Sequence, residues 1–158
     1  MRLSLRLEYL TQFSGPMRPF IIHMKDVQAD GNCGLRAIAD MLSFDEDGLA
    51  QVRCDLLKKM HVYAQLYESV YDSAECLEEI RHSLNHFEGE ASYDHWMVMS
   101  EIGYLISSHY NVVLLLLSLH QSLTFLPLWT ETILHAARRN IAIGFVNNHF
   151  IEVGYFFS

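Results

Sequence analysis

The hydrophobic residues in the first two thirds of the chain recur with the period of an α-helix. One apolar stripe predicts a helix from about Cys33 to Leu42, directly after the turn-forming pair Asp30-Gly31. The same spacing predicts three further helices. They cover residues 49–67, 75–87 and 100–109.

The pattern changes after residue 110. Unbroken apolar runs predict neighbouring strands over 111–119 and 122–128. The segment 140–157 indicates two more strands, divided at Asn147-Asn148, because asparagine tolerates the positive φ that a tight hairpin turn needs. Helices followed by a small, mostly antiparallel sheet predict an α+β fold.

The beginning of the chain is expected to differ from the rest. Residues 1–19 contain one glycine and two prolines and are predicted to form a loosely attached lead-in. Residues 20–24, FIIHM, predict a short strand. From residue 20 to residue 158 the chain is expected to form a single domain.

The composition is that of a folded protein. Hydrophobic residues make up 51% and charged residues 19% of the chain, which excludes a disordered chain. The net charge of -8, without a cluster of Lys or Arg, argues against nucleic acid and anionic membrane as partners. The apolar run from Val112 to Leu117 is far shorter than the roughly 20 residues that cross a bilayer. With no signal peptide evident, we expect an intracellular monomer, located in the cytoplasm, the nucleus or both.

The chain has three cysteines, Cys33, Cys54 and Cys76. An odd number without CxxC spacing predicts neither a disulfide framework nor a zinc site, and favours a reducing compartment. His82 and His86 share a helix face, but no third ligand is evident, so a solvated face is expected there. The sequence therefore predicts no metal and no other cofactor.

Cys33 lies at the entrance to the first predicted helix. The unpaired N–H groups and the positive end of a helix dipole favour a thiolate, which is the nucleophilic form of cysteine. Gly31 allows a sharp turn, and Asn32 is a good N-cap residue. The alternative is a small buried residue at a helix start, because buried cysteines are common and inert.

A catalytic cysteine needs a histidine nearby in space, wherever that histidine lies in the sequence. His149 follows the predicted hairpin turn and begins an apolar strand, which would hold its backbone rigidly. His23, in the first predicted strand, is a weaker candidate. The other histidines are expected on helix surfaces or in loops: His61, His82, His86, His95, His109, His120 and His135.

Three blocks of the sequence resemble the ovarian-tumour (OTU) domain family of cysteine proteases. The stretch DGNC, ending at Cys33, together with the LRAI that begins at Leu35, resembles the nucleophile motif. Trp96 followed by Glu101-Ile102 is similar to the second block, although Met97 stands where the family usually has glycine. The stretch IAIGFVNNHFIEV resembles the third block. The blocks have the family's order and span nearly the whole chain.

The resemblance implies a papain-like α+β fold with helices around the sheet, and thiol hydrolysis of isopeptide bonds, usually those of ubiquitin chains. Cys33 would be the nucleophile and His149 the general base that later protonates the leaving amine. Backbone N–H groups of Asp30, Gly31 and Cys33 would bind the oxyanion. Ubiquitin or polyubiquitin is then the expected partner, and no cofactor is implied.

The sequence departs from the family after the histidine. Many members have Asp or Asn two residues on, where this chain has Ile151, and Glu152 should point to the other face of the strand. The group that orients His149 must then be another residue. We favour Asp30, which matches an acidic position that many members use. The alternatives are Asp26, Asn147 and Asn148.

Two other readings stay open. A non-catalytic ubiquitin-binding module would keep the fold without efficient chemistry, and the missing acid favours it. A thiol protease of a viral or mobile-element polyprotein would keep Cys33 and His149 but not ubiquitin. Among the remaining marked residues, Trp96 is expected to be a core residue, and Cys54 and Cys76 are expected to be structural.

Overall fold

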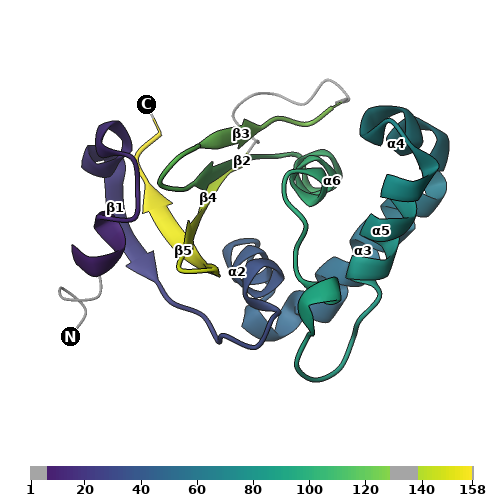
Figure 1. The fold of residues 1–158 in the computed structure, drawn as a ribbon, viewed down its shortest axis with the longest axis horizontal. Helices are drawn as coiled ribbons and strands as arrows, with labels where there is room; N and C mark the ends of the chain where they lie inside the picture. The colour runs from purple at the N-terminus through teal and green to yellow at the C-terminus, as the bar shows by residue number, and fades with distance from the viewer. Residues whose placement is uncertain (1–6, 129–138, 158) are drawn as a thin grey trace.

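The computed structural model describes residues 7–128 and 139–157 (Figure 1). A helical turn over residues 7–10, a 3-10 helix and a strand come first, and helices follow. These elements are η1 (Gly15–Phe20), β1 (Ile21–Lys25), α2 (Cys33–Met41), η2 (Glu46–Gly48), α3 (Leu49–Val62), α4 (Ala64–Tyr71), α5 (Ala74–Leu84), η3 (Tyr93–His95) and α6 (Glu101–Tyr110). Strands make up the rest: β2 (Val112–Leu117), β3 (Leu123–Phe125), β4 (Arg139–Val146) and β5 (His149–Tyr155).

The strands of the described residues form one mixed sheet in the order β1-β5-β4-β2-β3. Strands β2 and β4 run parallel, while β1–β5, β4–β5 and β2–β3 are antiparallel pairs. Strand β1 therefore pairs with the end of the chain and not with a neighbour in sequence. The α+β class and the mostly antiparallel sheet are confirmed.

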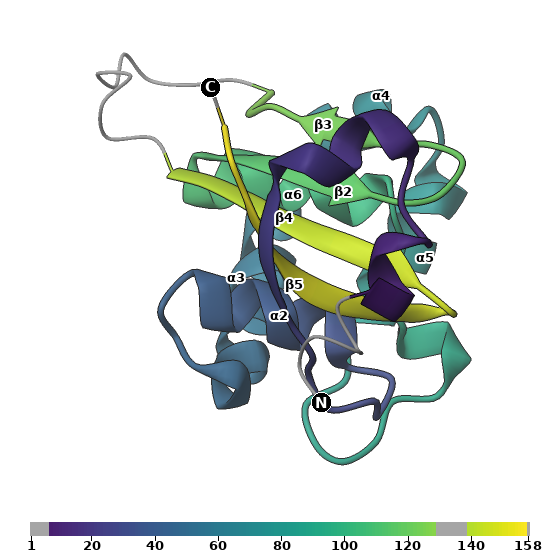
Figure 2. The ribbon, with the colours of Figure 1, turned by 90° about the vertical axis from the view of Figure 1, so that its left-hand side faces the viewer.

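Each face of the sheet is covered by its own hydrophobic core. On one face α2 and α6 pack against the sheet, with α3 and α5 behind them (Figure 1), and the core there includes Leu35, Ile38 and Leu105. On the other face the segment before β1 crosses the strands (Figure 2). Tyr9 and Phe13 are buried there, together with strand residues such as Ile151 and Val153.

The packing of Tyr9 and Phe13 corrects one expectation about the lead-in over residues 1–19. Its described part is not loosely attached, because Phe13 is fully buried and lies against Gly144. The glycine and prolines of this segment form η1, which brings the chain into β1. The domain boundary at residue 20 stays a prediction.

The helices differ from the prediction at one place. The predicted helix over 49–67 is two helices, α3 and α4, because Tyr63 leaves the helical conformation with φ -112° and ψ 30°. The bend allows Tyr67 to be fully buried, and this packing outweighs the continuous apolar pattern. The other predicted elements are found, with their ends shifted by up to three residues.

The hairpin between β4 and β5 was predicted at Asn147-Asn148, and the structure has it there. Val146 pairs with His149 across a two-residue loop, and both asparagines have positive φ, 49° and 59°. That combination defines a type I′ turn. His149 is therefore held at the first position of a strand inside the sheet.

Two further expectations concern membrane spans and His135. In the part of the chain that the structure describes, every helix is too short or too polar to cross a membrane. His135 lies outside the described residues.

Candidate active site

Cys33 is the first residue of α2, as the sequence predicts. Its side chain is only 8% exposed, and its sulfur accepts a hydrogen bond from the backbone N–H of Phe150 (3.4 Å). The thiol forms part of the wall of a cavity of about 260 Å³, to which Trp96 and His149 also contribute. Cys33 thus lies beside β5, more than a hundred residues away in the sequence.

The His149 ring lies between Cys33 and Asp26. It is hydrogen-bonded to the Cys33 side chain, and its Nε2 is 2.6 Å from Oδ1 of Asp26. The bond to Cys33 raises the pKa of His149 most, burial opposes this, and the bond to Asp26 raises the pKa further, to about 9. The ring is therefore mostly an imidazolium at neutral pH.

Asp26 follows directly after β1, and two further donors hold its carboxylate. The Tyr9 hydroxyl donates to Oδ2 (2.9 Å), and the backbone N–H of Val27 donates to Oδ1 (3.0 Å). Burial and the bond to Asp26 raise the pKa of Tyr9 to about 12, so its hydroxyl keeps its proton and stays a donor. The order of contacts is Tyr9, Asp26, His149, Cys33.

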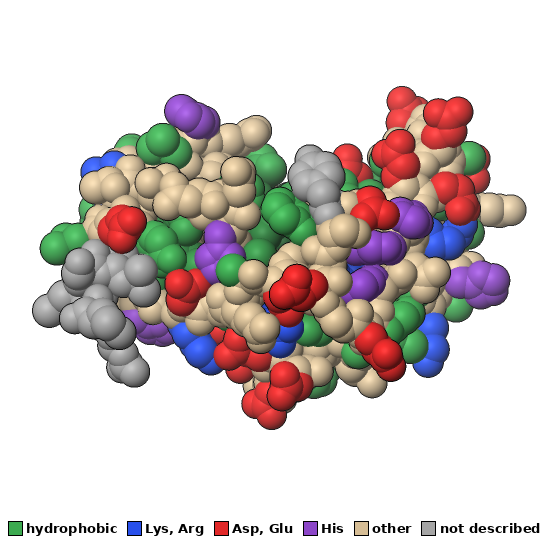
Figure 3. Space-filling view, turned by 60° about the horizontal axis from the view of Figure 1, so that its bottom comes forward, with side chains coloured by type: hydrophobic (Ala, Val, Ile, Leu, Met, Phe, Trp, Pro, Cys, Tyr) green, Lys and Arg blue, Asp and Glu red, His purple; other side chains and the backbone are tan. Residues whose placement is uncertain are grey.

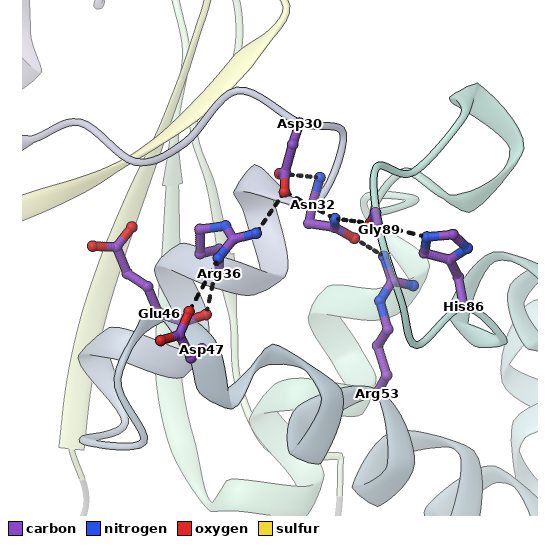
Figure 4. Close-up of polar contacts among 8 residues, drawn as sticks. All are labelled: Asp30, Asn32, Arg36, Glu46, Asp47, Arg53, His86 and Gly89. Atoms are coloured by element: carbon purple, nitrogen blue, oxygen red, sulfur yellow. Dashed lines mark hydrogen bonds and ion pairs between the residues drawn. The ribbon is translucent and has the colours of Figure 1, made fainter.

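Asp30 does not contact His149, contrary to the preferred assignment. Its carboxylate pairs with Arg36 Nη2 (2.5 Å) and accepts a hydrogen bond from the backbone N–H of Asn32 (3.0 Å), as Figure 4 shows. Burial acts to raise the pKa of Asp30, but the bonds from Asn32 and Arg36 outweigh it and hold the pKa below its ordinary value. Asp30 therefore stabilises the loop before the nucleophile, because its carboxylate is paired with Arg36.

Asn32 also acts differently from the expected helix cap. Its side chain makes no cap bond but donates to Gly89 O (3.1 Å) and accepts from Arg53 Nη2 (3.0 Å) (Figure 4). Arg53 is almost fully buried and also donates to the carbonyls of Ser83 (2.7 Å) and His95 (3.0 Å). The loop before Cys33 is thus tied to α3, α5 and the loop after α5.

Gly31 has the backbone conformation that the turn requires. Its φ is +81°, and a Cβ atom there would lie 2.0 Å from the carbonyl oxygen of Ala91. The N–H of Asn32 is used by Asp30, whereas no described residue accepts from the N–H groups of Gly31 and Cys33. Of the three predicted oxyanion donors, Gly31 and Cys33 line the cavity and have N–H groups available to a ligand, whereas Asp30 does not line it.

An apolar groove of about 550 Å³, larger in volume than this cavity, adjoins it. Trp96, Met97, Asn148 and Phe150 line both hollows. Trp96 is half-buried and belongs to neither core, which corrects its expected role as a core residue. A chain entering along the groove would meet Trp96 and Phe150 before it reaches the thiol.

The residues after the hairpin turn lie as strand alternation predicts. Ile151 is buried in the second core, and Glu152 points to the opposite face, where it contacts Asp40 and Lys25 of α2 and β1. Within the described residues Asn147 and Asn148 make no hydrogen bond to His149. Of the candidate groups named for orienting His149, Asp26 alone reaches the ring.

Two participants carry no signal in the sequence. Tyr9 lies in the segment that was expected to be loosely attached, and Arg53 lies on a helix with an ordinary amphipathic pattern. Only the fold brings them to the site. The group of side chains with spacing suited to a metal lies elsewhere in the described chain, at His82, Asp94 and His95.

Comparisons with known proteins place the fold. Neither a family model nor a curated protein sequence matches the chain. The viral OTU domain protease from Dera Ghazi Khan virus is similar in structure, with a TM-score of 0.64, 10% identity, and coverage of 89% of this chain and 85% of that one. The OTUD1 OTU domain has a TM-score of 0.62 and 16% identity, over 97% and 94%. The Hazara virus OTU bound to ubiquitin has a TM-score of 0.59 and 14% identity, over 93% and 87%.

Proposed function

The chain has the papain-like α+β fold of the OTU domains, and from this premise we propose that it is a cysteine-type deubiquitinase. It would cleave isopeptide or peptide bonds of ubiquitin conjugates. The observation that carries the proposal is that Cys33 and His149 lie together in the wall of one cavity, with Asp26 bonded to the His149 ring. A nucleophile, a base and a group that orients the base form the constellation of a thiol hydrolase.

In the first half of the reaction the sulfur of Cys33 attacks the carbonyl carbon of the scissile amide. The imidazolium of His149 favours a thiolate beside it. The negative charge moves to the carbonyl oxygen, which the free N–H groups of Gly31 and Cys33 are positioned to receive. When the C–N bond breaks, His149 gives its proton to the leaving amine, and a thioester remains on Cys33.

In the second half a water molecule enters the cavity. His149, now neutral, takes a proton from the water as its oxygen attacks the thioester carbon. The C–S bond breaks, the acid product leaves, and the thiolate–imidazolium pair is restored. Asp26 keeps the ring in place during both halves, because its carboxylate accepts from Nε2 and leaves the other ring nitrogen for the proton transfers.

Three observations support ubiquitin as the substrate. One of the similar OTU structures is bound to ubiquitin, which is a property of that protein. In this chain the apolar groove beside the catalytic cavity offers room for an extended peptide that approaches the thiol along Trp96 and Phe150. The net charge of -8 suits a partner with a basic face.

The non-catalytic module is the main alternative. The sequence favours it through Ile151, which stands where an orienting Asp or Asn is common. The bond between Asp26 and His149 supplies an orienting group from another strand end, so this argument loses its force. A thiol protease with a different polypeptide substrate would use the same site and differ only in the groove.

A ubiquitin probe with a C-terminal electrophile tests these readings. We expect a covalent adduct that Cys33→Ala abolishes and Cys54→Ala leaves intact, since Cys54 lies away from the cavity. Binding without an adduct would indicate the module, and neither binding nor adduct would indicate another substrate. Circular dichroism on Cys33→Ala checks that the fold is kept.

The three free thiols bear on the cellular location. Cys33, Cys54 and Cys76 are unpaired, and free thiols persist in reducing compartments. We infer a cytoplasmic or nuclear location and action as a monomer. Fractionation of cells that express the full chain, followed by size-exclusion chromatography, measures both.

A further inference from the structure

A second cluster of titratable side chains lies outside the proposed active site. His82 of α5 and the η3 residues Asp94 and His95 bring one potential ligand atom each to within 4.8 Å of one another. The two helical elements come from different parts of the chain and contact each other directly. Figure 3 shows histidine side chains gathered on this face of the molecule, close to acidic ones.

The distances inside the cluster fit a tetrahedral metal ion. Asp94 Oδ2 is 2.8 Å from His82 Nε2 and 3.6 Å from His95 Nε2. Zinc bonds of about 2.0 Å at tetrahedral angles separate neighbouring ligand atoms by about 3.3 Å. The two distances to Asp94 lie on either side of this value, and the two histidine nitrogens are within 4.8 Å of each other.

The histidine rings also pack against one another. The His95 ring lies between those of His82 and His86, with centroid distances of 4.6 and 4.9 Å. His86 Nε2 is within hydrogen-bonding distance of Gly89 O, so His86 acts as a stacking neighbour to the cluster. His82 and Asp94 are more than half exposed, which leaves an open path for an ion from solvent.

An ordinary ion pair explains this cluster less well. An exposed His–Asp contact contributes about 0–1 kcal/mol and needs only two residues. Here a second imidazole has its Nε2 3.6 Å from the same carboxylate, beyond hydrogen-bonding distance, so three potential ligand atoms cluster where an ion pair needs only two. Two neutral imidazoles and a carboxylate are the donor set that zinc accepts.

We propose that His82, Asp94 and His95 form a zinc-binding site, with water as the fourth ligand. In the sequence only His82 and His86 are spaced as a possible pair of metal ligands, and no third ligand is evident beside them. The fold supplies the missing ligands from η3. The site is separate from the proposed catalytic residues, because none of its residues lines the catalytic cavity.

The position of the site indicates what zinc would do. The ion would connect α5 to η3, and η3 leads directly into Trp96 and Met97 of the cavity wall. The carbonyl of His95 already accepts from Arg53, which also holds Asn32 next to the nucleophile. Zinc would therefore fix the loop that forms one side of the catalytic cavity. It would also stabilise the protein, because it would bind the folded state and not the unfolded state.

The test uses the full chain without an affinity tag and with Cys33→Ala, so that the thiol beside His149 cannot bind the metal. Titration calorimetry with zinc chloride should give one site per chain, and zinc should raise the Tm. His82→Gln and Asp94→Asn should each weaken binding by roughly tenfold or more, since even outer-shell partners of a metal are worth 10–100-fold. His61→Gln, on the exposed surface of α3, should bind zinc normally.

Cobalt(II) provides a second measurement that does not depend on stability. The Cys33→Ala protein should show the visible absorption of tetrahedral cobalt, and His82→Gln should lose it. His82 and Asp94 are exposed, so these variants are expected to fold, which circular dichroism checks. No binding to the Cys33→Ala protein, or binding that survives both substitutions, would overturn the proposal. Neither result bears on whether Cys33 reacts with a ubiquitin probe.

Discussion

At the scale of single residues, the state of His149 depends on two neighbours. The pKa of a free histidine is near 6.5, and the contacts with Cys33 and Asp26 raise that of His149 to about 9. Its proton is needed to expel the leaving amine. Activity should therefore fall as the pH rises through about 9, when the imidazolium is lost.

The first prediction removes the Asp26 charge. Asp26→Asn keeps the size of the side chain but gives up the carboxylate that favours the imidazolium, so the alkaline fall in kcat/KM should move to lower pH. The pH profile of kcat/KM with a fluorogenic ubiquitin substrate measures this shift. Asp30→Asn, which does not touch the ring, should leave the alkaline limb in place even if it lowers the rate. An unshifted limb in Asp26→Asn would contradict the assignment.

The second prediction concerns Tyr9. Its hydroxyl donates to the charged Asp26 carboxylate, so Tyr9→Phe removes a hydrogen bond of about 1.5–3 kcal/mol. Part of this energy should appear as a fall in kcat of roughly tenfold, with little change in KM. Tyr155→Phe is the matched control, because among the described residues the Tyr155 hydroxyl makes one hydrogen bond, to the sulfur of Met17. Equal rates for Tyr9→Phe and the wild type would show that the hydroxyl has no part in positioning.

The residue scale also shows where sequence reasoning stops. Cys33 and His149 carry local signals, a turn before a helix and a turn before a strand, and the structure brings them together. Asp26 and Asp30 are only four residues apart, and the choice between them depends on Arg36. Arg36, one helical turn into α2, pairs with Asp30, so Asp26 is the carboxylate that reaches His149. This choice depends on the three-dimensional arrangement and cannot be predicted from the sequence.

At the scale of elements, the alternation of side chains along β5 places His149 and Glu152 on opposite faces of the sheet. His149 serves the cavity at the start of the strand, while Glu152 lies buried on the α2 side against Asp40, with Lys25 and Glu46 nearby. Burial, more than the hydrogen bond and charge of Asp40, raises the pKa of Glu152 to about 8. The alternation of strand side chains was predictable, but the partner on α2 was not, since it depends on how the helix lies across the sheet.

The third prediction follows from that carboxyl group. An unfolded glutamic acid loses its proton near pH 4.5, whereas the folded protein keeps it up to about pH 8. Between these values the folded state binds more protons, so stability should fall as the pH rises. Glu152→Gln can still donate to Asp40 without carrying a titratable proton, and should flatten this slope and be more stable than the wild type at pH 8.5.

Urea unfolding at pH 5.5 and pH 8.5 measures the difference. Glu68→Gln is the control, since Glu68 is exposed on α4 and is not among the groups that shift the pKa of Glu152. A Glu152→Gln protein whose free energy of unfolding falls with pH as steeply as that of the wild type would refute the assignment.

At the scale of the whole molecule, the order of elements and the fold class follow from periodicity, because apolar spacing reports which face each element buries. The joining of α3 and α4 into one predicted helix shows the limit of this signal. Both halves have apolar residues at helical spacing, and only the burial of Tyr67 reveals the bend at Tyr63. The expectation of a loosely attached lead-in is wrong for a related reason. Gly15 and the prolines near it predict a turn, but they do not predict which surface the residues before the turn pack against.

The last prediction tests whether the segment before β1 is part of the folded unit. Phe13 is fully buried on the sheet face opposite α2, and its ring fills the space above Gly144. Phe13→Ala should therefore cost about 3–5 kcal/mol of unfolding free energy, as for other large aromatic residues in a core. Leu7→Ala, in the same segment but 64% exposed, should change stability by less than about 0.5 kcal/mol. Urea unfolding of the two variants decides the point. If Phe13→Ala is as mild as Leu7→Ala, the segment is the loose lead-in that its composition suggests. If it is severe, the second core extends to the start of the described chain, and Tyr9 reaches Asp26 because Phe13 holds the segment against the sheet.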